Sequence, residues 1–288
     1  MQLARARRRI LVVDAGRPRN RFARASHGFL GQDGVAPAEI MREASTQLLL
    51  YPSVDFAQLE ATGVAKNDGS FVVSLSDGAE VRTRKLVLAT GVADTLPLDS
   101  MIPRWGVSVL HCPYCHGYEV RDQPMALIAN VEGASHQAMI LPDWGPTTFY
   151  TQRVFEPSAE EAASLTARGV GIERTPVTEL IGNGTDIRAL RLADGREVAA
   201  QVVFTAPRTR MASPLAEQLG CDFLDGPTGP YLSVDAMQQT SVAGVFAAGD
   251  VASPMYNATF ASAAGVMAGI SAHRALVLDA AQRAMDRS

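Results

Sequence analysis

Two cysteines separated by two residues, Cys112 and Cys115, are the side chains best suited to chemistry in this 288-residue sequence. They lie in the segment His-Cys-Pro-Tyr-Cys-His-Gly-Tyr-Glu at positions 111–119. The spacing lets the two sulfur atoms meet across one turn, and Pro113 stiffens the backbone between them. Such a pair becomes reactive when one sulfur is readily held as a thiolate. The motif therefore predicts a redox-active dithiol.

Four other interpretations of the cysteine pair compete with this one. A structural disulfide is typical of exported proteins, and nothing marks this chain as secreted. A zinc site normally has a second cysteine pair or spaced histidines, whereas the third cysteine, Cys221, has no partner motif. Cys-x-x-Cys-His also matches the attachment motif of c-type haem, which belongs to exported proteins, and no export signal is recognised here. Two buried cysteines with coincidental spacing are the remaining alternative.

Composition excludes several classes of protein. The chain is 47% hydrophobic and 19% charged, with 24 glycines and 16 prolines, which is typical of a globular protein with many turns. The net charge of −4 gives no reason to expect nucleic acid or an anionic membrane as a partner. Residues 1–9 are rich in arginine, but the apolar block 10–13 is too short for a signal sequence. We expect two domains, no membrane-spanning segment and a cytoplasmic location.

A second site is predicted at Asp14, which lies near the end of the segment 9–16, a stretch typical of a buried parallel strand that ends in an acid and a glycine. In dinucleotide-binding folds an acid at this place binds a ribose hydroxyl, about 20 residues after a Gly-x-Gly-x-x-Gly phosphate loop. Only 13 residues precede Asp14. We therefore expect the loop and its strand to be missing, with residues 1–8 as the end of the helix that follows them. A simple loop or helix cap is the alternative role of Asp14.

The elements that must position these residues follow from periodicity and turn signals. A polar loop at 16–34, which contains Arg19, leads to a helix at 38–50. Strands are expected at 54–57, 71–75, 80–84 and 85–91. After a linker at 93–103 and the cysteine motif, strands at 125–131 and 147–151 flank a helix at 134–141, which is a second βαβ opening. The remaining expected elements are a helix at 157–168, strands at 170–173, 187–192 and 197–205, a linker at 208–214, strands at 231–234 and 245–248, and a helix at 257–278.

Four segments in this order resemble the low-molecular-weight thioredoxin reductase family of flavin-dependent disulfide oxidoreductases. They are the strand with Asp14, the triplet Ala89-Thr90-Gly91, the Cys112/Cys115 pair, and Gly-Val-Phe-Ala-Ala-Gly-Asp at 244–250. The resemblance covers nearly the whole chain. It implies an α/β fold with two Rossmann-like three-layer domains. Residues 1–94 and 210–288 would form a discontinuous FAD-binding domain, and residues 95–209 an inserted NAD(P)-type domain carrying the dithiol.

The resemblance also assigns roles to residues. Gly249 and Asp250 would bind the ribityl or pyrophosphate part of FAD, where a strand of small residues and a helix N-terminus approach the ligand closely. The residues implied for cofactor binding are Asp14, Arg19, Ala89, Thr90, Gly91, Gly249, Asp250 and Asn257. Ordinary packing at a helix start is the alternative for Asn257.

In the resembling family Cys115 would exchange electrons with the flavin and Cys112 would react with the substrate disulfide. The family has an acid directly after the second cysteine; here His116 takes that place and can act as acid and base near neutral pH. The Cys-Pro-Tyr-Cys-His variant is most similar to the branch that includes dithiol oxidases of the gliotoxin and holomycin type. The implied partners are a thioredoxin-like protein or a small-molecule dithiol or disulfide, and a second copy in a homodimer.

One departure from the family concerns NADPH. Where the family has Gly-x-Gly-x-x-Ala, this chain has Ala-Asn-Val-Glu-Gly-Ala at 129–134. Val131 and Glu132 place a branched side chain and a negative charge where backbone amides would contact the pyrophosphate. The arginine cluster for the 2′-phosphate is also absent, since only Arg153 follows the strand at 147–151. The resemblance thus implies FAD as cofactor, and these residues argue against NADPH.

Three functions follow from the sequence. The first is a thiol–disulfide oxidoreductase that moves two electrons between the cysteine pair and FAD, either towards a thioredoxin-like disulfide or, as a dithiol oxidase, from a dithiol to oxygen. The second is a non-catalytic or truncated remnant that no longer holds FAD firmly. The third is a haem protein, which the missing export signal disfavours.

Overall fold

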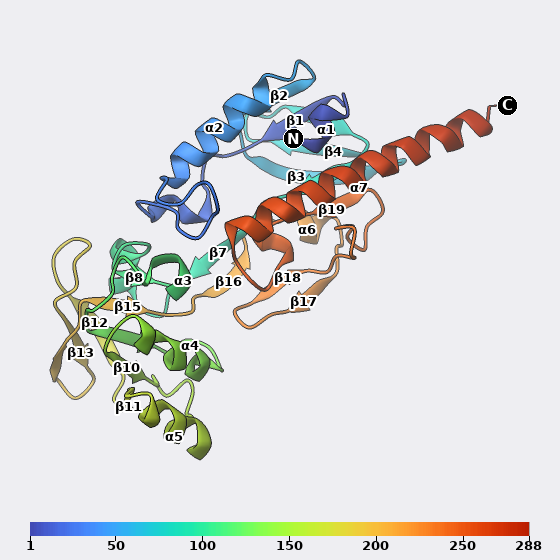
Figure 1. Ribbon diagram of the computed structural model, residues 1–288. Helices are drawn as coiled ribbons and strands as arrows, with labels where there is room; N and C mark the ends of the chain where they lie inside the picture. Colours follow the sequence, from blue (N-terminus) through green and yellow to red (C-terminus); the bar gives the residue numbers. More distant parts are fainter. Residues whose placement is uncertain (288) are drawn as a thin grey trace. The chain divides into compact units, whose positions relative to one another are not determined.

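The computed structural model describes residues 1–287, which divide into two compact units (Figure 1). The first unit comprises Met1–Arg19, Ala38–Ala93 and the chain from Arg210 onward, and the second comprises Asn20–Pro37 and Asp94–Thr209. The chain passes between the units after residues 19 and 37, and again within β7 (Val92–Thr95) and β16 (Arg208–Met211), which pair as a two-stranded sheet. The sequence analysis had placed residues 20–37 in the first unit.

The first unit is built from small sheets. Parallel pairs form between β1 (Ile10–Val13) and β2 (Val54–Ala57), and between β6 (Leu86–Leu88) and β19 (Val245–Ala247). These apolar runs suit parallel strands, which are usually covered on both faces. Antiparallel sheets complete the unit: β3 (Ala61–Asn67), β4 (Ser70–Leu75) and β5 (Glu80–Thr83) form one, and β17 (Phe223–Asp225) and β18 (Pro230–Leu232) form the other.

Strands β1 and β6 each have one edge that no other strand within residues 1–287 covers. The N–H of Ile10 donates to the Ser53 carbonyl at 2.9 Å, so the backbone groups of Leu11 face away from β2. The N–H of Leu86 donates to the Gly244 carbonyl at 3.0 Å, so the backbone groups of Val87 face away from β19. Leu11 and Val87 are both 38% exposed. Two apolar parallel strands therefore present unpaired edges.

The helices of the first unit are α1 (Gln2–Arg5), α2 (Pro37–Leu49), α6 (Leu215–Gln218) and the long α7 (Ala258–Met285). Asn257 caps α7, because its Oδ1 accepts a hydrogen bond from the Thr259 N–H at 2.8 Å. The buried small residues Ala268 and Ala272 let α7 pack closely on Phe246 of β19, with Leu3 of α1 against the same cluster. Small side chains thus determine how the helix sits on the sheet.

Helix α7 corrects one sequence expectation. By length and composition it could span a membrane, with a mean hydropathy of 1.3 over an 18-residue window. The sequence analysis had found no segment of that kind. Core helices pass the same test, and α7 contributes Ala268, Gly269, Ser271 and Ala272 to the buried part of the unit.

The second unit has a five-stranded parallel sheet in the order β11-β10-β9-β15-β8. Its strands are β8 (Val109–Leu110), β9 (Met125–Ile128), β10 (Thr147–Tyr150), β11 (Gly171–Glu173) and β15 (Val202–Phe204). Helices α4 (Ala134–Ile140) and α5 (Ala159–Ala167) follow β9 and β10 as in a βαβ fold. Leu127, Phe149 and Phe204 are buried in its core. The sheet brings β8, which precedes the cysteine motif, beside β15.

A second, antiparallel sheet in this unit comprises β12 (Val177–Ile181), β13 (Ala189–Leu192) and β14 (Glu197–Ala199). The sequence analysis expected one strand at 197–205, but the chain leaves this sheet after Ala199 and enters the parallel sheet at Val202. The expected linker at 208–214 also begins with a strand, β16. At 197–205 the chain supplies strands to two sheets, which periodicity alone does not separate. At 208–211 the sequence Arg-Thr-Arg-Met lacks an apolar pattern, and the strand forms by pairing with β7.

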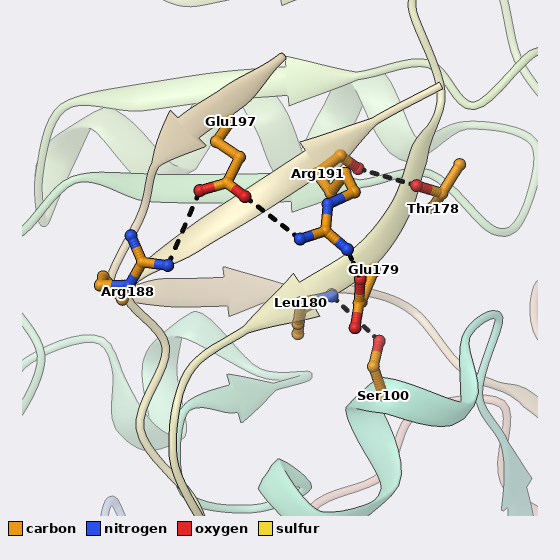
Figure 2. Close-up of polar contacts among 7 residues, drawn as sticks. All are labelled: Ser100, Thr178, Glu179, Leu180, Arg188, Arg191 and Glu197. Carbon is orange, nitrogen blue, oxygen red and sulfur yellow. Dashed lines mark hydrogen bonds and ion pairs between the residues drawn. The ribbon is translucent and has the colours of Figure 1, made fainter. Parts of the chain in front are cut away.

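Two arginines of the second unit lie in contrasting environments. Figure 2 shows Arg191 on β13 between Glu179 and Glu197, with these side chains between 42% and 48% exposed. Arg104, at the end of the 3₁₀ helix Asp99–Arg104, is only 6% exposed. Its guanidinium donates to the carbonyl groups of Ser100, Gly182 and Asp186 at 2.7, 3.0 and 3.2 Å. The buried arginine therefore ties the 3₁₀ helix to the turn between β12 and β13.

We expect Arg104→Met to lower the free energy of unfolding by about 3 kcal/mol, because three carbonyl oxygens lose the charged donor that the buried Arg104 supplies. Arg191→Met is the matched control and should change it by less than about 1 kcal/mol, since exposed ion pairs contribute little. Urea denaturation followed by circular dichroism measures both. Equal losses of stability in the two variants would contradict the stabilising role of the buried Arg104.

Candidate functional site

The two cysteines of the motif lie at the start of a short helix, α3 (Pro113–His116). Cys112 has an extended backbone and precedes the helix, Pro113 occupies its first turn, and the N–H of Cys115 donates to the Cys112 carbonyl at 3.2 Å. The two residues are joined by a disulfide bond, with Cα atoms 5.2 Å apart. Both are half-buried. The local turn thus presents an oxidised pair that partly faces solvent.

Packing around α3 fixes its position in the second unit. The carbonyl of His111, at the end of β8, accepts a hydrogen bond from Gln137 Nε2 at 2.6 Å. A Cβ atom at Gly117 would lie 2.6 Å from the Pro113 carbonyl oxygen and 2.8 Å from Trp144 Cδ1, so only glycine fits there. Tyr114, between the cysteines, is 74% exposed and meets the Trp144 ring edge-on at 5.4 Å. The Tyr114 side chain is therefore exposed to solvent beside the disulfide.

The histidine after the second cysteine has an unusual environment. Both ring nitrogens of His116 are buried and have no hydrogen-bond partner among the described residues. Burial lowers the pKa of His116 below its ordinary value, the charge of Glu119 raises it, and His27 lowers it. The imidazole is therefore biased towards its neutral form, in which one ring nitrogen can accept a proton.

A loop distant in sequence contacts the end of the cysteine motif through His27. His27 Nδ1 lies 3.5 Å from Asp33 Oδ1, and its Nε2 lies 3.6 Å from Glu119 Oε1. Both partners belong to the second unit, in which residues 20–37 pack with the cysteine segment. The sequence analysis singled out neither His27 nor Glu119. The signal that could have found them is the Glu at the end of the cysteine motif and the His-Gly and Asp-Gly pairs of the loop.

In the first unit, the residues expected to bind the flavin gather at the C-terminal end of β19. Gly249 has a φ of +81°, which favours glycine, and Asp250 follows it. Arg19 Nη1 lies 3.2 Å from Asp250 Oδ2, and the Arg19 guanidinium stacks 4.1 Å from the centre of the Tyr256 ring. Arg19 and Asp250, 231 positions apart in the chain, are thus in direct contact.

A small cavity of about 240 Å³ lies next to this contact. Its walls include Gly249, Asp250, Met255 and Phe260, with the small residues Ala261 and Ala264 of α7. Ligand pockets for drug-sized molecules run from roughly 300 to 1,000 Å³. The cavity therefore has room for only part of a dinucleotide. Its Asp250 carboxylate suits a chain that carries hydroxyl groups, such as the ribityl group.

Of the other residues expected to bind the cofactor, Asp14 and Asn257 make local hydrogen bonds. The carboxylate of Asp14 accepts a hydrogen bond from the Gly16 N–H at 2.8 Å, so it stabilises its own turn. Gly91 has a φ of +67° after β6, with open space where a Cβ would lie. Ala89 and Thr90 precede it. The Asn257 side chain is occupied as the cap of α7. The residues present thus fit parts of FAD, and the sequence holds no glycine-rich phosphate loop before Asp14.

The loop at 129–134 is held by contacts with neighbouring elements. Asn130 Nδ2 donates to the Ala206 carbonyl at 3.2 Å, and Gly133, with a φ of +77°, precedes α4. The Ser135 hydroxyl donates to Glu161 Oε1 at 2.5 Å. Glu161 and Glu160 also line a cavity of about 300 Å³ beside α4. Two carboxylates near the start of α4 disfavour a bound phosphate.

Residues 148–272 match the pyridine nucleotide-disulphide oxidoreductase family. Thioredoxin reductase tcpT of Claviceps purpurea is 32% identical over 97% of this chain and 90% of that protein. The chain belongs to the thioredoxin reductase-like oxidoreductases. Thioredoxin reductase sirT of Leptosphaeria maculans is 29% identical over 93% of this chain and 87% of its own length.

Solved structures agree with this membership of the thioredoxin reductase-like oxidoreductases. The oxidoreductase from Agrobacterium tumefaciens has a TM-score of 0.91 and 45% identity, over 96% of this chain and 93% of that chain. HlmI has a TM-score of 0.89 and 34% identity, over 99% of this chain and 91% of that chain. The predicted family, the Rossmann-type α/β fold and the assignment as an oxidoreductase enzyme are confirmed.

Proposed function

We propose that this thioredoxin reductase-like protein is an FAD-dependent thiol–disulfide oxidoreductase in which Cys112 and Cys115 are the redox pair. One observation carries the proposal: the two cysteines are bonded across a single turn that ends at His116, whose ring nitrogens are buried and unpartnered. A structural disulfide has no use for an adjacent buried base. The catalytic residues proposed are Cys112, Cys115 and His116.

The chemistry starts from the disulfide. A thiolate of the substrate attacks Cys112 Sγ, the Cys112–Cys115 bond breaks, and Cys115 leaves as a thiolate. The second substrate thiolate then attacks the sulfur bound to Cys112, which releases the oxidised substrate and a reduced cysteine pair. His116 takes up a proton from a substrate thiol, because its imidazole is held neutral by burial. FAD supplies the two-electron acceptor that returns the pair to the disulfide.

Residues of the first unit are proposed to hold FAD. Asp250 would bind the ribityl hydroxyls or the pyrophosphate side, with Gly249 allowing close approach. Arg19 would orient Asp250 through their 3.2 Å contact. Asp14 would bind the ribose, Ala89, Thr90 and Gly91 would border the flavin at the end of β6, and Asn257 would act by fixing the start of α7. The domain assignment, with FAD bound by 1–94 and 210–288, is part of this proposal.

Electron flow from a dithiol through the cysteine pair to FAD and on to oxygen is favoured over use of NADPH. Glu160 and Glu161 beside α4, together with Val131 and Glu132 in the loop, support this direction. The substrate would then be a small-molecule dithiol, whereas reduction of a thioredoxin-like protein requires the reverse flow. We further propose that the protein acts in the cytoplasm as a homodimer.

We expect a dithiol to bleach the visible flavin absorbance of the anaerobic protein, and NADPH and NADH to leave it unchanged. The reason is that the cysteine pair accepts electrons from thiols, whereas the altered loop at 129–134 does not hold a nucleotide phosphate. The measurement is a flavin spectrum titrated separately with dithiothreitol, NADPH and NADH. Complete bleaching by NADPH would reverse the proposed direction, and bleaching by none of the three would remove the cysteine pair from flavin chemistry.

A second candidate function is a non-catalytic remnant that no longer holds FAD firmly. The Asp14 carboxylate favours it, because it is already occupied by the Gly16 N–H of its own turn. Absorbance of the purified protein separates the two functions. A colourless protein that takes up no added FAD supports the remnant, and a yellow one supports the oxidoreductase.

A further inference from the structure

We propose that Gln238 is a further residue of the cofactor site, where its side-chain amide and the Asp250 carboxylate bind the same hydroxyl group of the ribityl chain of FAD. The inference rests on the proposed function, since it deepens the assignment of the cavity beside Asp250 to FAD. All the residues that carry it belong to the first compact unit. The sequence analysis did not single out Gln238.

Gln238 lies in a tight turn whose hydrogen bonds determine its backbone conformation. The N–H of Gln238 donates to the Asp235 carbonyl at 2.9 Å, and the N–H of Asp235 donates to the Gln239 carbonyl at 2.9 Å. The Asp235 carboxylate accepts hydrogen bonds from the N–H groups of Met237 and Gln239 at 2.8 and 2.9 Å. The turn is therefore held from both sides of Gln238.

The backbone of Gln238 is in the left-handed region, with a φ of +61°. A residue in this conformation within a tight turn is usually glycine, because glycine has no Cβ atom. Residues with longer side chains are strained there, and strained residues cluster at sites that bind ligands. The chain thus carries a glutamine where the backbone favours glycine.

A hydrogen bond connects this turn to the strand that leads to Asp250. The N–H of Ala247, the last residue of β19, donates to the Gln238 carbonyl at 3.0 Å. Gly249 and Asp250 follow Ala247 closely in the chain. Gln238 lines the same cavity of about 240 Å³ as Gly249 and Asp250. The strained turn thus places Gln238 in the wall of the proposed cofactor cavity.

The polar side chains that line the cavity differ in their partners. They belong to Gln238, Asp250 and Ser253. Asp250 Oδ2 contacts Arg19 Nη1 at 3.2 Å. The Ser253 hydroxyl donates to the Met255 carbonyl at 2.7 Å and accepts from the Met255 N–H at 3.1 Å. The Gln238 amide makes no hydrogen bond with any residue in the range 1–287, so it is available to a ligand.

A carboxylate and an amide in one cavity suit a hydroxyl group. The carboxylate of Asp250 only accepts hydrogen bonds, whereas the amide of Gln238 both donates and accepts them. A ligand hydroxyl can therefore donate to Asp250 and accept from Gln238 Nε2. A phosphate only accepts hydrogen bonds and is repelled by the carboxylate. The chemistry of this wall thus favours the ribityl chain over the pyrophosphate of FAD.

The test compares the FAD affinities of Gln238→Ala and Gln239→Ala. Gln239 is the matched control, because it is the neighbouring glutamine and is exposed. Titration of the full-length protein stripped of flavin, monitored by the quenching of FAD fluorescence, gives each Kd. We expect Gln238→Ala to weaken binding about three- to tenfold, as for the loss of one neutral hydrogen bond, and Gln239→Ala to leave it unchanged. Equal affinities of the two variants would overturn the role of Gln238.

Gln238→Gly separates an effect on binding from an effect on folding. Glycine suits a φ of +61°, so this variant without flavin should unfold within about 2 °C of the wild type. It should nevertheless bind FAD as weakly as Gln238→Ala, because both variants lack the amide. Binding of FAD by Gln238→Gly with the affinity of the wild type would contradict the inference.

The double variant Gln238→Ala/Asp250→Ala tests whether the two side chains share one hydroxyl. Its loss of affinity should be smaller than the product of the two single losses, since groups that act on the same ligand atom are not independent. A loss equal to that product would refute the shared hydroxyl. A wild-type protein that takes up no FAD would overturn the proposed function as well, whereas equal affinities of Gln238→Ala and Gln239→Ala overturn only the role of Gln238.

Discussion

Cys115→Ser should abolish dithiol turnover and leave flavin bound. Without the second sulfur, Cys112 can form a mixed disulfide with a substrate but has no partner with which to form the 112–115 bond. We expect a loss of at least about a thousandfold in turnover, as for removal of a covalent catalytic group. Steady-state oxidation of dithiothreitol, followed beside the flavin absorbance of the purified variant, measures both properties.

Cys221→Ser is the matched control for this variant. Cys221 is 6% exposed, and its Sγ lies 3.7 Å from Thr240 Oγ1 in the first unit. Burial raises the pKa of the Cys221 thiol, so it is not a thiolate at neutral pH and should take no part in turnover. Equal activities of Cys115→Ser and the wild type would remove the dithiol from the mechanism.

Asp250→Ala should weaken FAD binding by roughly ten- to a hundredfold. A hydrogen bond to a charged group contributes about 1.5–3 kcal/mol, and the substitution also removes the partner that orients Arg19. Glu60→Ala is the matched control, because Glu60 pairs with Arg17 at 2.6 Å in the same unit but is 51% exposed. Titration of protein stripped of flavin, monitored by the quenching of FAD fluorescence, gives both affinities.

An Asp250→Ala variant that binds FAD as tightly as Glu60→Ala would show that the cofactor does not contact this carboxylate. Circular dichroism of the two variants separates this result from a loss of folding. A variant that is folded and colourless supports the proposed site.

Much of the fold follows from periodicity. The apolar runs that became β1, β9 and β10 and the helical spacing of α2 and α7 were predicted, with ends that differ by a few residues. The strands that were missed are β3, β7, β8, β12, β16 and β17. In β3, Thr62, Lys66 and Asn67 interrupt the apolar alternation, and the strand is held by pairing with β4. Tertiary pairing rather than local sequence forms such strands.

The sequence could predict those site residues that form a local motif. It could not predict contacts between residues far apart in the chain. The cysteine spacing and the Gly249-Asp250 pair stand out in the sequence. The contact of His27 with Glu119 joins residues 92 positions apart in the chain. The loop sequence marks His27 as a turn residue but does not show which residue it contacts. Chain order likewise does not show that residues 20–37 pack with the cysteine segment.

The uncovered edges of β1 and β6 carry a consequence for how the protein behaves at high concentration. Each edge offers a row of amide and carbonyl groups flanked by an apolar side chain, Leu11 or Val87, with neither proline nor charge in the middle of the strand. Natural sheets usually protect such borders against pairing with foreign strands. Here an extended peptide, or the same strand of another molecule, can pair with an edge that stays open. Pairing between molecules would promote self-association and lower the solubility of the protein.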